Sequence, residues 1–281
     1  MTPEALQKHR QTMELLGRLA APNEFVRIKN FTVNGIPCER VRDKKRRGAS
    51  PCLILYAHGG GYVSGGLSYA QILAAKMALE TDCDVISFEY RLAPEHKYPS
   101  QLEDALSVWN RMTGRGYTAD RILLAGDSAG GNLALCLAQS LIAGRGIRPA
   151  ECPRALILYS PWTDMVAMSS SYALYKDTDP ILTRSFVEEC AAAYIDDRGL
   201  PKDPEFSPIN GSFAGFPPTL IQVGRNEILL DDSVRLAALI NAAGGDATLD
   251  IEEDGWHVYQ QMPILMAAHA MKRVGEFVRR L

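Results

Sequence analysis

Residues 121–143 read RILLAGDSAGGNLALCLAQSLIA, and this stretch decides the fold. Its first seven residues form an apolar run typical of a buried strand, and the residues after Ser128 have the composition of a buried helix. Between them lies the pentad Gly126-Asp127-Ser128-Ala129-Gly130, a GxSxG pattern. Between a strand and a helix, this pattern predicts a sharp turn that lifts a serine hydroxyl above the sheet. Ser128 is therefore the candidate nucleophile; the alternative is a glycine-rich turn that binds phosphate or only packs.

The rest of the chain alternates between strands and helices around this turn. Near-continuous apolar strands separated by helices are typical of a parallel sheet that is covered on both faces. Asn34-Gly35 lies between two strand-like segments and is a strong hairpin signal, so the sheet should start with antiparallel strands. The pattern predicts one doubly wound, mostly parallel α/β domain over residues 1–281. The expected strands are 25–33, 36–42, 52–58, 84–90, 121–127, 154–160, 218–224 and 247–253, and the expected helices are 3–20, 68–81, 100–113, 129–143, 183–195, 232–243 and 263–280.

Two segments lie outside this alternation. The stretch between Trp162 and Pro217 has one clear helical pattern and several prolines among its Gly and Asp residues. An insertion of this length in a compact α/β fold is usually a lid or a binding loop. The other segment is the amphipathic N-terminal helix, whose apolar face includes Met13 and Leu16. This face should form either the roof of a pocket or a packing surface at the sheet edge.

A run of glycines, His58-Gly59-Gly60-Gly61, follows the expected strand 52–58. Glycines allow backbone N–H groups to point into a cavity without intervening side chains. Two such groups, with the N–H of the residue after the nucleophile, can stabilise a negative oxygen. We expect Gly60, Gly61 and Ala129 to supply these donors. His58 precedes the serine and should fix the glycine loop by packing and hydrogen bonding.

Two histidines, His257 and His269, follow Ser128 in the chain. With a GxSxG turn of this type, the base is expected after the serine. His269 lies within an expected helix, whereas His257 lies in the loop after the last expected strand. Loops at the carboxyl edge of a sheet are where catalytic groups collect. His257 is therefore the candidate general base.

The acid that would orient this imidazole is less clearly marked. The loop after strand 218–224 offers Glu227, Asp231 and Asp232, although the two aspartates could instead cap the following helix. Asp164 is a rival, because it follows the end of the preceding strand. The residues themselves leave this choice open.

Composition excludes several other classes of function. The chain has 30 basic and 33 acidic residues and a net charge of −3, so it has no surplus to neutralise nucleic acid. No segment has the roughly 18 consecutive apolar residues of a membrane span, and the charged N-terminal helix is unlike a secretory signal. The basic run 40–47 should be a solvated edge. The six cysteines lack a CxxC pair, and those in apolar runs should be free and buried. A reducing, cytoplasmic location is therefore expected.

Six segments form a recognisable set: HGGG at 58–61, YRLAPEH at 90–96, GDSAGG at 126–131, SPWTD at 160–164, EILLDD at 227–232 and GWH at 255–257. Together they resemble the hormone-sensitive-lipase-like branch of the α/β-hydrolases. The GDSAG pentad resembles the esterase subgroup that also includes lactone hydrolases of small terpenoids. The resemblance extends from about residue 50 to the C-terminus.

This resemblance implies an α/β-hydrolase fold that hydrolyses carboxylic esters without a cofactor or metal. It also implies a helical cap built from residues 1–22 and 163–216. It places Glu227 at the acid position, where the branch commonly has aspartate, so the loop must accommodate one more methylene. Trp162 and Trp256 flank the expected pocket, either as substrate contacts or as core aromatics.

The resulting expectation is a serine carboxylesterase that acts on small, short-acyl esters through Ser128, His257 and Glu227. Lactone or amide hydrolysis by the same residues is an alternative. A non-catalytic receptor, like the plant gibberellin receptors that resemble this branch, is another, but those receptors lack the catalytic histidine. The expected partner is a small ester, and a homodimer is possible.

Overall fold

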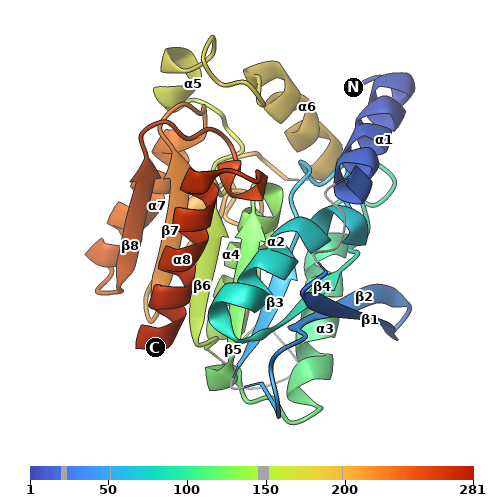
Figure 1. Cartoon of the computed structure of the whole chain (residues 1–281). Helices are drawn as coiled ribbons and strands as arrows, with labels where there is room; N and C mark the ends of the chain where they lie inside the picture. Colours follow the sequence, from blue (N-terminus) through green and yellow to red (C-terminus); the bar gives the residue numbers. More distant parts are fainter. Residues whose placement is uncertain (20–23, 51, 145–151, 198) are drawn as a thin grey trace.

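The computed structural model describes residues 1–19, 24–50, 52–144, 152–197 and 199–281. Within them, an eight-stranded sheet runs through the molecule in the order β1-β2-β4-β3-β5-β6-β7-β8 (Figure 1). β1 pairs antiparallel with β2 and β2 with β4, and the remaining pairs are parallel. The α/β arrangement and its antiparallel start are confirmed.

The bounds of the expected strands and helices lie within two residues of those predicted from sequence, whereas α5 and the three 3-10 turns were not predicted. Residue 20, the expected end of the first helix, lies outside the described residues. The strands are β1 (Val26–Val33), β2 (Ile36–Asp43), β3 (Leu53–Ala57), β4 (Asp84–Phe88), β5 (Ile122–Asp127), β6 (Ala155–Tyr159), β7 (Thr219–Gly224) and β8 (Ala247–Glu252). The helices are α1 (Pro3–Leu19), α2 (Leu67–Thr81), α3 (Ser100–Thr113), α4 (Ala129–Ile142), α5 (Ser171–Leu174), α6 (Arg184–Tyr194), α7 (Leu230–Ala242) and α8 (Leu265–Arg280), with short 3-10 turns η1 (Ala119–Arg121), η2 (Pro208–Asn210) and η3 (Tyr259–Gln261).

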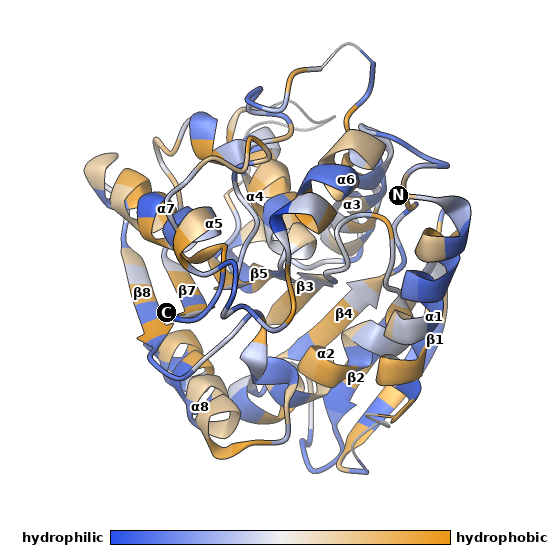
Figure 2. Cartoon of the chain, turned by 90° about the horizontal axis from the view of Figure 1, so that it is seen from above, coloured by the Kyte–Doolittle hydropathy of each residue, from blue (hydrophilic) through white to orange (hydrophobic). Residues whose placement is uncertain are grey.

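The central strands β3 to β7 are buried on both faces of the sheet. Successive strand side chains point to opposite sides, so Leu53 and Leu55 join one hydrophobic cluster while Ile54 and Tyr56 join the other. Seen from above, α3, α4 and α7 cover the first face, and α2 and α8 cover the second (Figure 2). This double burial explains why the central strands read as continuous apolar runs.

One expectation about the cysteines is wrong, because Cys52 and Cys83 form a disulfide with a Cα–Cα distance of 5.1 Å. The two residues are 31 positions apart and carry no local signal. They meet because β3 and β4 are parallel neighbours in which Leu53 is opposite Asp84, so the preceding residues are also opposite. Disulfides are rare in cytosolic proteins, so this bond removes one basis for expecting a reducing compartment.

The basic run 40–47 is also more than a solvated edge. Arg40 and Arg46 form ion pairs with Asp84, and Arg42 Nε lies 3.7 Å from the same carboxylate. Asp84 is fully buried at the start of β4, where an unpaired charge would be costly. The arginines therefore neutralise a buried acid beside the disulfide.

The two segments outside the alternation lie beyond the carboxyl ends of the strands (Figure 1). α1 contacts α6 there, with the His9 and Phe186 rings 4.9 Å apart. Arg10 fastens α1 to the body of the protein by donating to both carboxylate oxygens of Glu95, at 2.8 and 2.7 Å, and to the Val63 carbonyl at 2.7 Å. Residues 20–22 of the expected cap lie outside the described residues. No helix in the described ranges has the length and apolar character needed to cross a membrane.

Candidate active site

Ser128 occupies the turn between β5 and α4 with a backbone φ of 53° and ψ of −120°. This left-handed conformation is strained for a residue with a side chain and is typical of functional sites. The Ser128 N–H donates to the Tyr159 carbonyl at 2.9 Å, which holds the turn against β6. A Cβ added at Gly126 would collide with the carbonyl of Gly130, so the sharp turn requires glycine there. The hydroxyl-bearing turn is the one predicted from the GxSxG pattern.

Asp127 ties this turn to the glycine loop, a role that sequence reasoning missed. Its buried carboxylate accepts hydrogen bonds from the Tyr56 hydroxyl at 2.6 Å, the Tyr69 hydroxyl at 2.9 Å and the Gly59 N–H at 2.8 Å. Burial raises the pKa of Asp127, and the two tyrosine hydrogen bonds oppose that rise. The signal available in the sequence was an acid inside an otherwise apolar strand end.

The glycine loop presents free backbone donors. Gly60 and Gly61 have φ values of 112° and 62°, in the region that favours glycine. Within the described residues, the N–H groups of Gly60, Gly61 and Ala129 donate to no protein acceptor. A Cβ at Gly61 would come within 2.6 Å of Cys190 Sγ on α6, so the loop packs closely against α6.

His58 supports this loop from below. Its ring is fully buried, stacks on Tyr90 at a centroid distance of 4.2 Å, and places Nδ1 2.7 Å from the Gly59 carbonyl oxygen. Burial lowers the pKa of His58 to about 4, although the hydrogen bond with Gly59 acts in the opposite direction. The ring is therefore neutral at neutral pH, and its contacts fit the supporting role expected from sequence.

His257 and Glu227 meet behind the cavity. The Nδ1 atom of His257 lies 3.1 Å from Oε1 of Glu227, which is fully buried in the turn between β7 and α7. The second carboxylate oxygen, Oε2, accepts from the Ser160 hydroxyl at 2.8 Å and from the Gly224 N–H at 2.9 Å.

The charge of Glu227 controls the titration of His257. Burial alone would lower the pKa of His257, but the hydrogen bond and negative charge of Glu227 outweigh it, with smaller contributions from Asp179 and Asp127. The net result is a pKa raised above the ordinary value of 6.5. The cationic imidazolium is therefore stabilised at this position.

The other carboxylates considered for the acid position are engaged elsewhere. Asp164 pairs with Arg235 at 2.8 Å, Asp231 accepts from the Ser171 N–H, and buried Asp232 accepts from the Thr163 N–H at 2.7 Å. The suggestion that the two aspartates cap the following helix is wrong. They lie inside the first turn of α7, whose N-cap residue is Leu229.

Ser128, His257, Gly60 and Gly61 line one cavity of about 230 Å³. Much of the lining comes from two helices: α1 contributes His9, Met13 and Leu16, and α6 contributes Phe186, Val187 and Cys190. The N-terminal helix therefore forms a wall of this cavity. A polar part of the lining comes from Tyr69 and Gln261, which are hydrogen-bonded to each other.

The structure separates the two tryptophans. Trp162 is buried and lines this cavity. Trp256 does not line it and instead packs against Tyr259, Ala267 and Ala270 on the α8 side. The idea that Trp256 contacts substrate therefore has no support from the geometry, because the residue before His257 points its side chain toward a helix.

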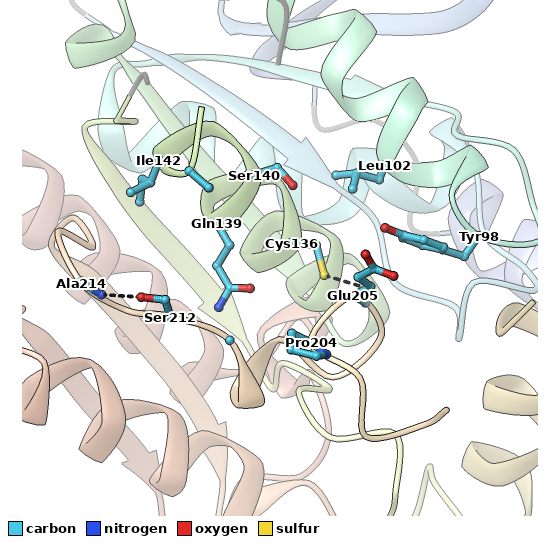
Figure 3. A pocket seen from close by; sticks show the side chains of 12 residues that line it. Tyr98, Leu102, Cys136, Gln139, Ser140, Ile142, Pro204, Glu205, Ser212 and Ala214 are labelled. Carbon is cyan, nitrogen blue, oxygen red and sulfur yellow. Dashed lines mark hydrogen bonds between the residues drawn. The ribbon is translucent and has the colours of Figure 1, made fainter. Parts of the chain in front are cut away.

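A second cavity of about 180 Å³ lies between α3, α4 and the 204–214 segment (Figure 3). Gln139 donates to the Pro208 carbonyl at 2.8 Å, and the Cys136 thiol donates to the Glu205 carbonyl at 3.6 Å. None of the predicted site residues lines this cavity. In the described part of the chain, no three His, Cys, Asp or Glu side chains are grouped as a metal site would need.

Comparison with known proteins identifies the family. A family model described as the alpha/beta hydrolase fold matches residues 54–261. The chain belongs to this family. It is 31% identical over 283 residues to an esterase of Acinetobacter venetianus, spanning 100% of this chain and 90% of the relative. An acetyl-hydrolase of Streptomyces hygroscopicus is 30% identical, with coverage of 96% and 87%.

Solved structures place the alpha/beta hydrolase within a narrower branch. The crystal structure of an esterase from the bacterial hormone-sensitive lipase family superimposes with a TM-score of 0.90 at 34% identity, covering 98% of this chain and 91% of that one. The protein is therefore a carboxylic ester hydrolase of the hormone-sensitive-lipase branch, as the sequence motifs implied.

Proposed function

We propose that the protein is a serine carboxylesterase for small, short-acyl esters, with Ser128 as nucleophile, His257 as general base and Glu227 as the acid. The observation that carries this proposal is the contact between His257 Nδ1 and Glu227 Oε1. His257 lines the same cavity as Ser128, and Ser128 lies on a strained turn. This is the arrangement of groups that nucleophilic acyl transfer requires.

In the acylation step, Ser128 Oγ attacks the ester carbonyl while His257 takes the hydroxyl proton. The imidazolium that forms is stabilised by the buried carboxylate of Glu227, in keeping with the raised pKa of His257. The carbonyl oxygen becomes negative and accepts hydrogen bonds from the N–H groups of Gly60, Gly61 and Ala129. These donors have no other protein acceptor among the described residues, so they are free for this role.

Collapse of the tetrahedral intermediate breaks the bond to the alcohol oxygen, which takes the proton from His257 and leaves. Water then attacks the acyl-enzyme with His257 again as base, and the acid product and free Ser128 are released. Apart from the attacking water, every catalytic group in these steps is a residue of the chain.

The cavity favours a short acyl chain. Its volume of about 230 Å³ is below the range of roughly 300–1,000 Å³ that is typical of pockets for drug-sized ligands. The lining by Trp162, Val187 and Cys190 is apolar, which suits an alkyl chain. A small ester as the partner, with no nucleic acid, remains part of the proposal. A cytoplasmic location also remains proposed, although the Cys52–Cys83 disulfide does not support it.

The test is hydrolysis of p-nitrophenyl esters from acetyl to palmitoyl, with kcat/KM measured for each, beside matched lactone and anilide substrates. We expect the highest kcat/KM between acetyl and hexanoyl. The Ser128→Ala variant should fold and lose several orders of magnitude in kcat. An optimum at ten or more acyl carbons, or near wild-type hydrolysis by folded Ser128→Ala, would contradict the proposal. Faster turnover of lactones or anilides than of esters would change the proposed substrate class to lactones or amides.

A further inference from the structure

We propose that Ser160 is a positioning residue that fixes Glu227 and the His257 loop in one arrangement through its hydroxyl group. The inference rests on the proposed roles of Glu227 and His257. It adds Ser160, which directly follows the third strand β6, to the machinery of the reaction. Ser160 itself does not line the cavity, so it acts through its neighbours rather than on the substrate.

The geometry gives one hydroxyl two distinct partners. Ser160 Oγ donates to Glu227 Oε2 at 2.8 Å and accepts from the N–H of Val258 at 3.1 Å. A serine hydroxyl offers one donor and two acceptor positions, so both bonds can exist together. Val258 directly follows His257, and both are buried. Ser160 therefore connects the carboxylate to the backbone that carries the imidazole.

The backbone of Ser160 is held in an unfavourable conformation to make these bonds. Its φ is 45°, in the left-handed region that residues with a side chain seldom adopt. Its N–H donates to the Gln222 carbonyl of β7 at 2.7 Å, and the side chain is fully buried. Strain of this kind persists where the surrounding structure imposes it, and it often marks a functional position.

The hydrogen bonds to Oε2 of Glu227 orient the other carboxylate oxygen, Oε1, toward His257. Oε2 is occupied by Ser160 and by the Gly224 N–H, which leaves Oε1 for His257 Nδ1. Glu227 has one more rotatable bond than aspartate, so it can adopt more orientations unless it is held. Without the hydroxyl, the Gly224 N–H is the donor to Oε2 that remains among the described residues, and the contact between Oε1 and Nδ1 should loosen.

The test compares Ser160→Ala and Ser160→Gly with the wild-type protein. Glycine tolerates the positive φ, so agreement between the two variants separates loss of the hydroxyl from backbone strain. We expect kcat to fall by about 10- to 100-fold, the effect of losing a hydrogen bond to a charged group. KM should change little, because Ser160 does not line the cavity. Ser233→Ala is the matched control, since Ser233 is equally buried on α7 and its hydroxyl has no partner among the described residues.

A double-mutant cycle distinguishes positioning from general packing. If Ser160 acts through Glu227, Ser160→Ala should have little further effect on kcat in the Glu227→Ala background. The same loss in both backgrounds, or a kcat within twofold of wild type for both Ser160 variants, would overturn the proposal.

A spectroscopic measurement keeps the inference independent of turnover. The Nδ1 proton of His257, which faces Glu227, should give a downfield proton NMR signal in the wild-type protein. That signal should move upfield in Ser160→Ala and stay in place in Ser233→Ala. An unchanged signal would contradict the role of Ser160. A wild-type protein without esterase activity but with a Ser160-dependent signal would contradict only the proposed function.

Discussion

Replacing Glu227 by glutamine tests the buried pair on which the proposed mechanism depends. The side chain keeps its size but loses its charge, so the imidazolium formed on His257 would be a buried cation without its closest counter-charge. Removing one partner of a buried ion pair costs about 3–5 kcal/mol. If that cost falls on the transition state, kcat decreases by roughly 10²- to 10⁴-fold. The amide can also donate to Nδ1 and favour the wrong imidazole tautomer.

The assay is hydrolysis of p-nitrophenyl acetate by purified variants whose circular dichroism matches that of the wild type. Asp164→Asn and Asp231→Asn are the comparison variants, because their carboxylates pair with Arg235 and the Ser171 N–H instead of His257. Both should keep kcat near the wild-type value. The reasoning fails if Glu227→Gln retains kcat within tenfold of wild type, or if Asp164→Asn is the variant that loses activity.

Two further outcomes follow from the same geometry. Catalysis needs neutral His257, so kcat/KM should fall as pH decreases through a midpoint above 6.5. The Glu227→Gln change should move this midpoint to lower pH, because the effect of burial on the pKa of His257 then outweighs the remaining charges. A pH–rate profile of both proteins measures the midpoint, and a midpoint unchanged by the substitution would contradict the prediction. Arg10→Ala should raise KM by loosening the α1 wall, while the melting temperature drops by no more than about 2–4 °C, since partly exposed ion pairs contribute about 0–1 kcal/mol. Arg18→Ala is its control, because Arg18 is on the same helix and its ion pair among the described residues is with Glu14. Equal kinetic effects of Arg10→Ala and Arg18→Ala would contradict the role of α1 as a cavity wall.

Much of the fold was predictable because its signals are local. Apolar runs, helical periodicity and the Asn34-Gly35 turn are written in short segments, and the hairpin residues have φ values of 48° and 86° as such turns require. The Cys52–Cys83 bond and the arginines around Asp84 were not predictable in this way. They depend on which strands become neighbours and in which register, and that is known only once the sheet is assembled.

In the candidate site, too, some residues have local sequence signals, whereas others can be identified only from the three-dimensional arrangement. Ser128, His257 and the glycine loop follow from motif and chain order. Glu227 could not be separated from its rivals by spacing, because the choice depends on which carboxylate reaches Nδ1 in three dimensions. Ser160 begins the SPWTD motif, but that motif does not indicate its contacts with Glu227 and Val258. Trp256 next to His257 was misleading because adjacent residues can point to different sides.

The insertion between β6 and β7 also contacts the glycine loop, through α6. It is expected from sequence as a lid over the pocket, yet it also supports the proposed oxyanion donors. Tyr62, directly after Gly61, has a φ of 64° and stacks on Tyr194 of α6 with ring centroids 3.8 Å apart. Its hydroxyl donates to Asn132 of α4 at 2.8 Å. The left-handed turn of the glycine loop is thus held between the cap and the helix that follows Ser128. A cap that only covered the pocket would affect substrate binding alone, whereas one that holds this turn also influences how well the donors face the developing charge.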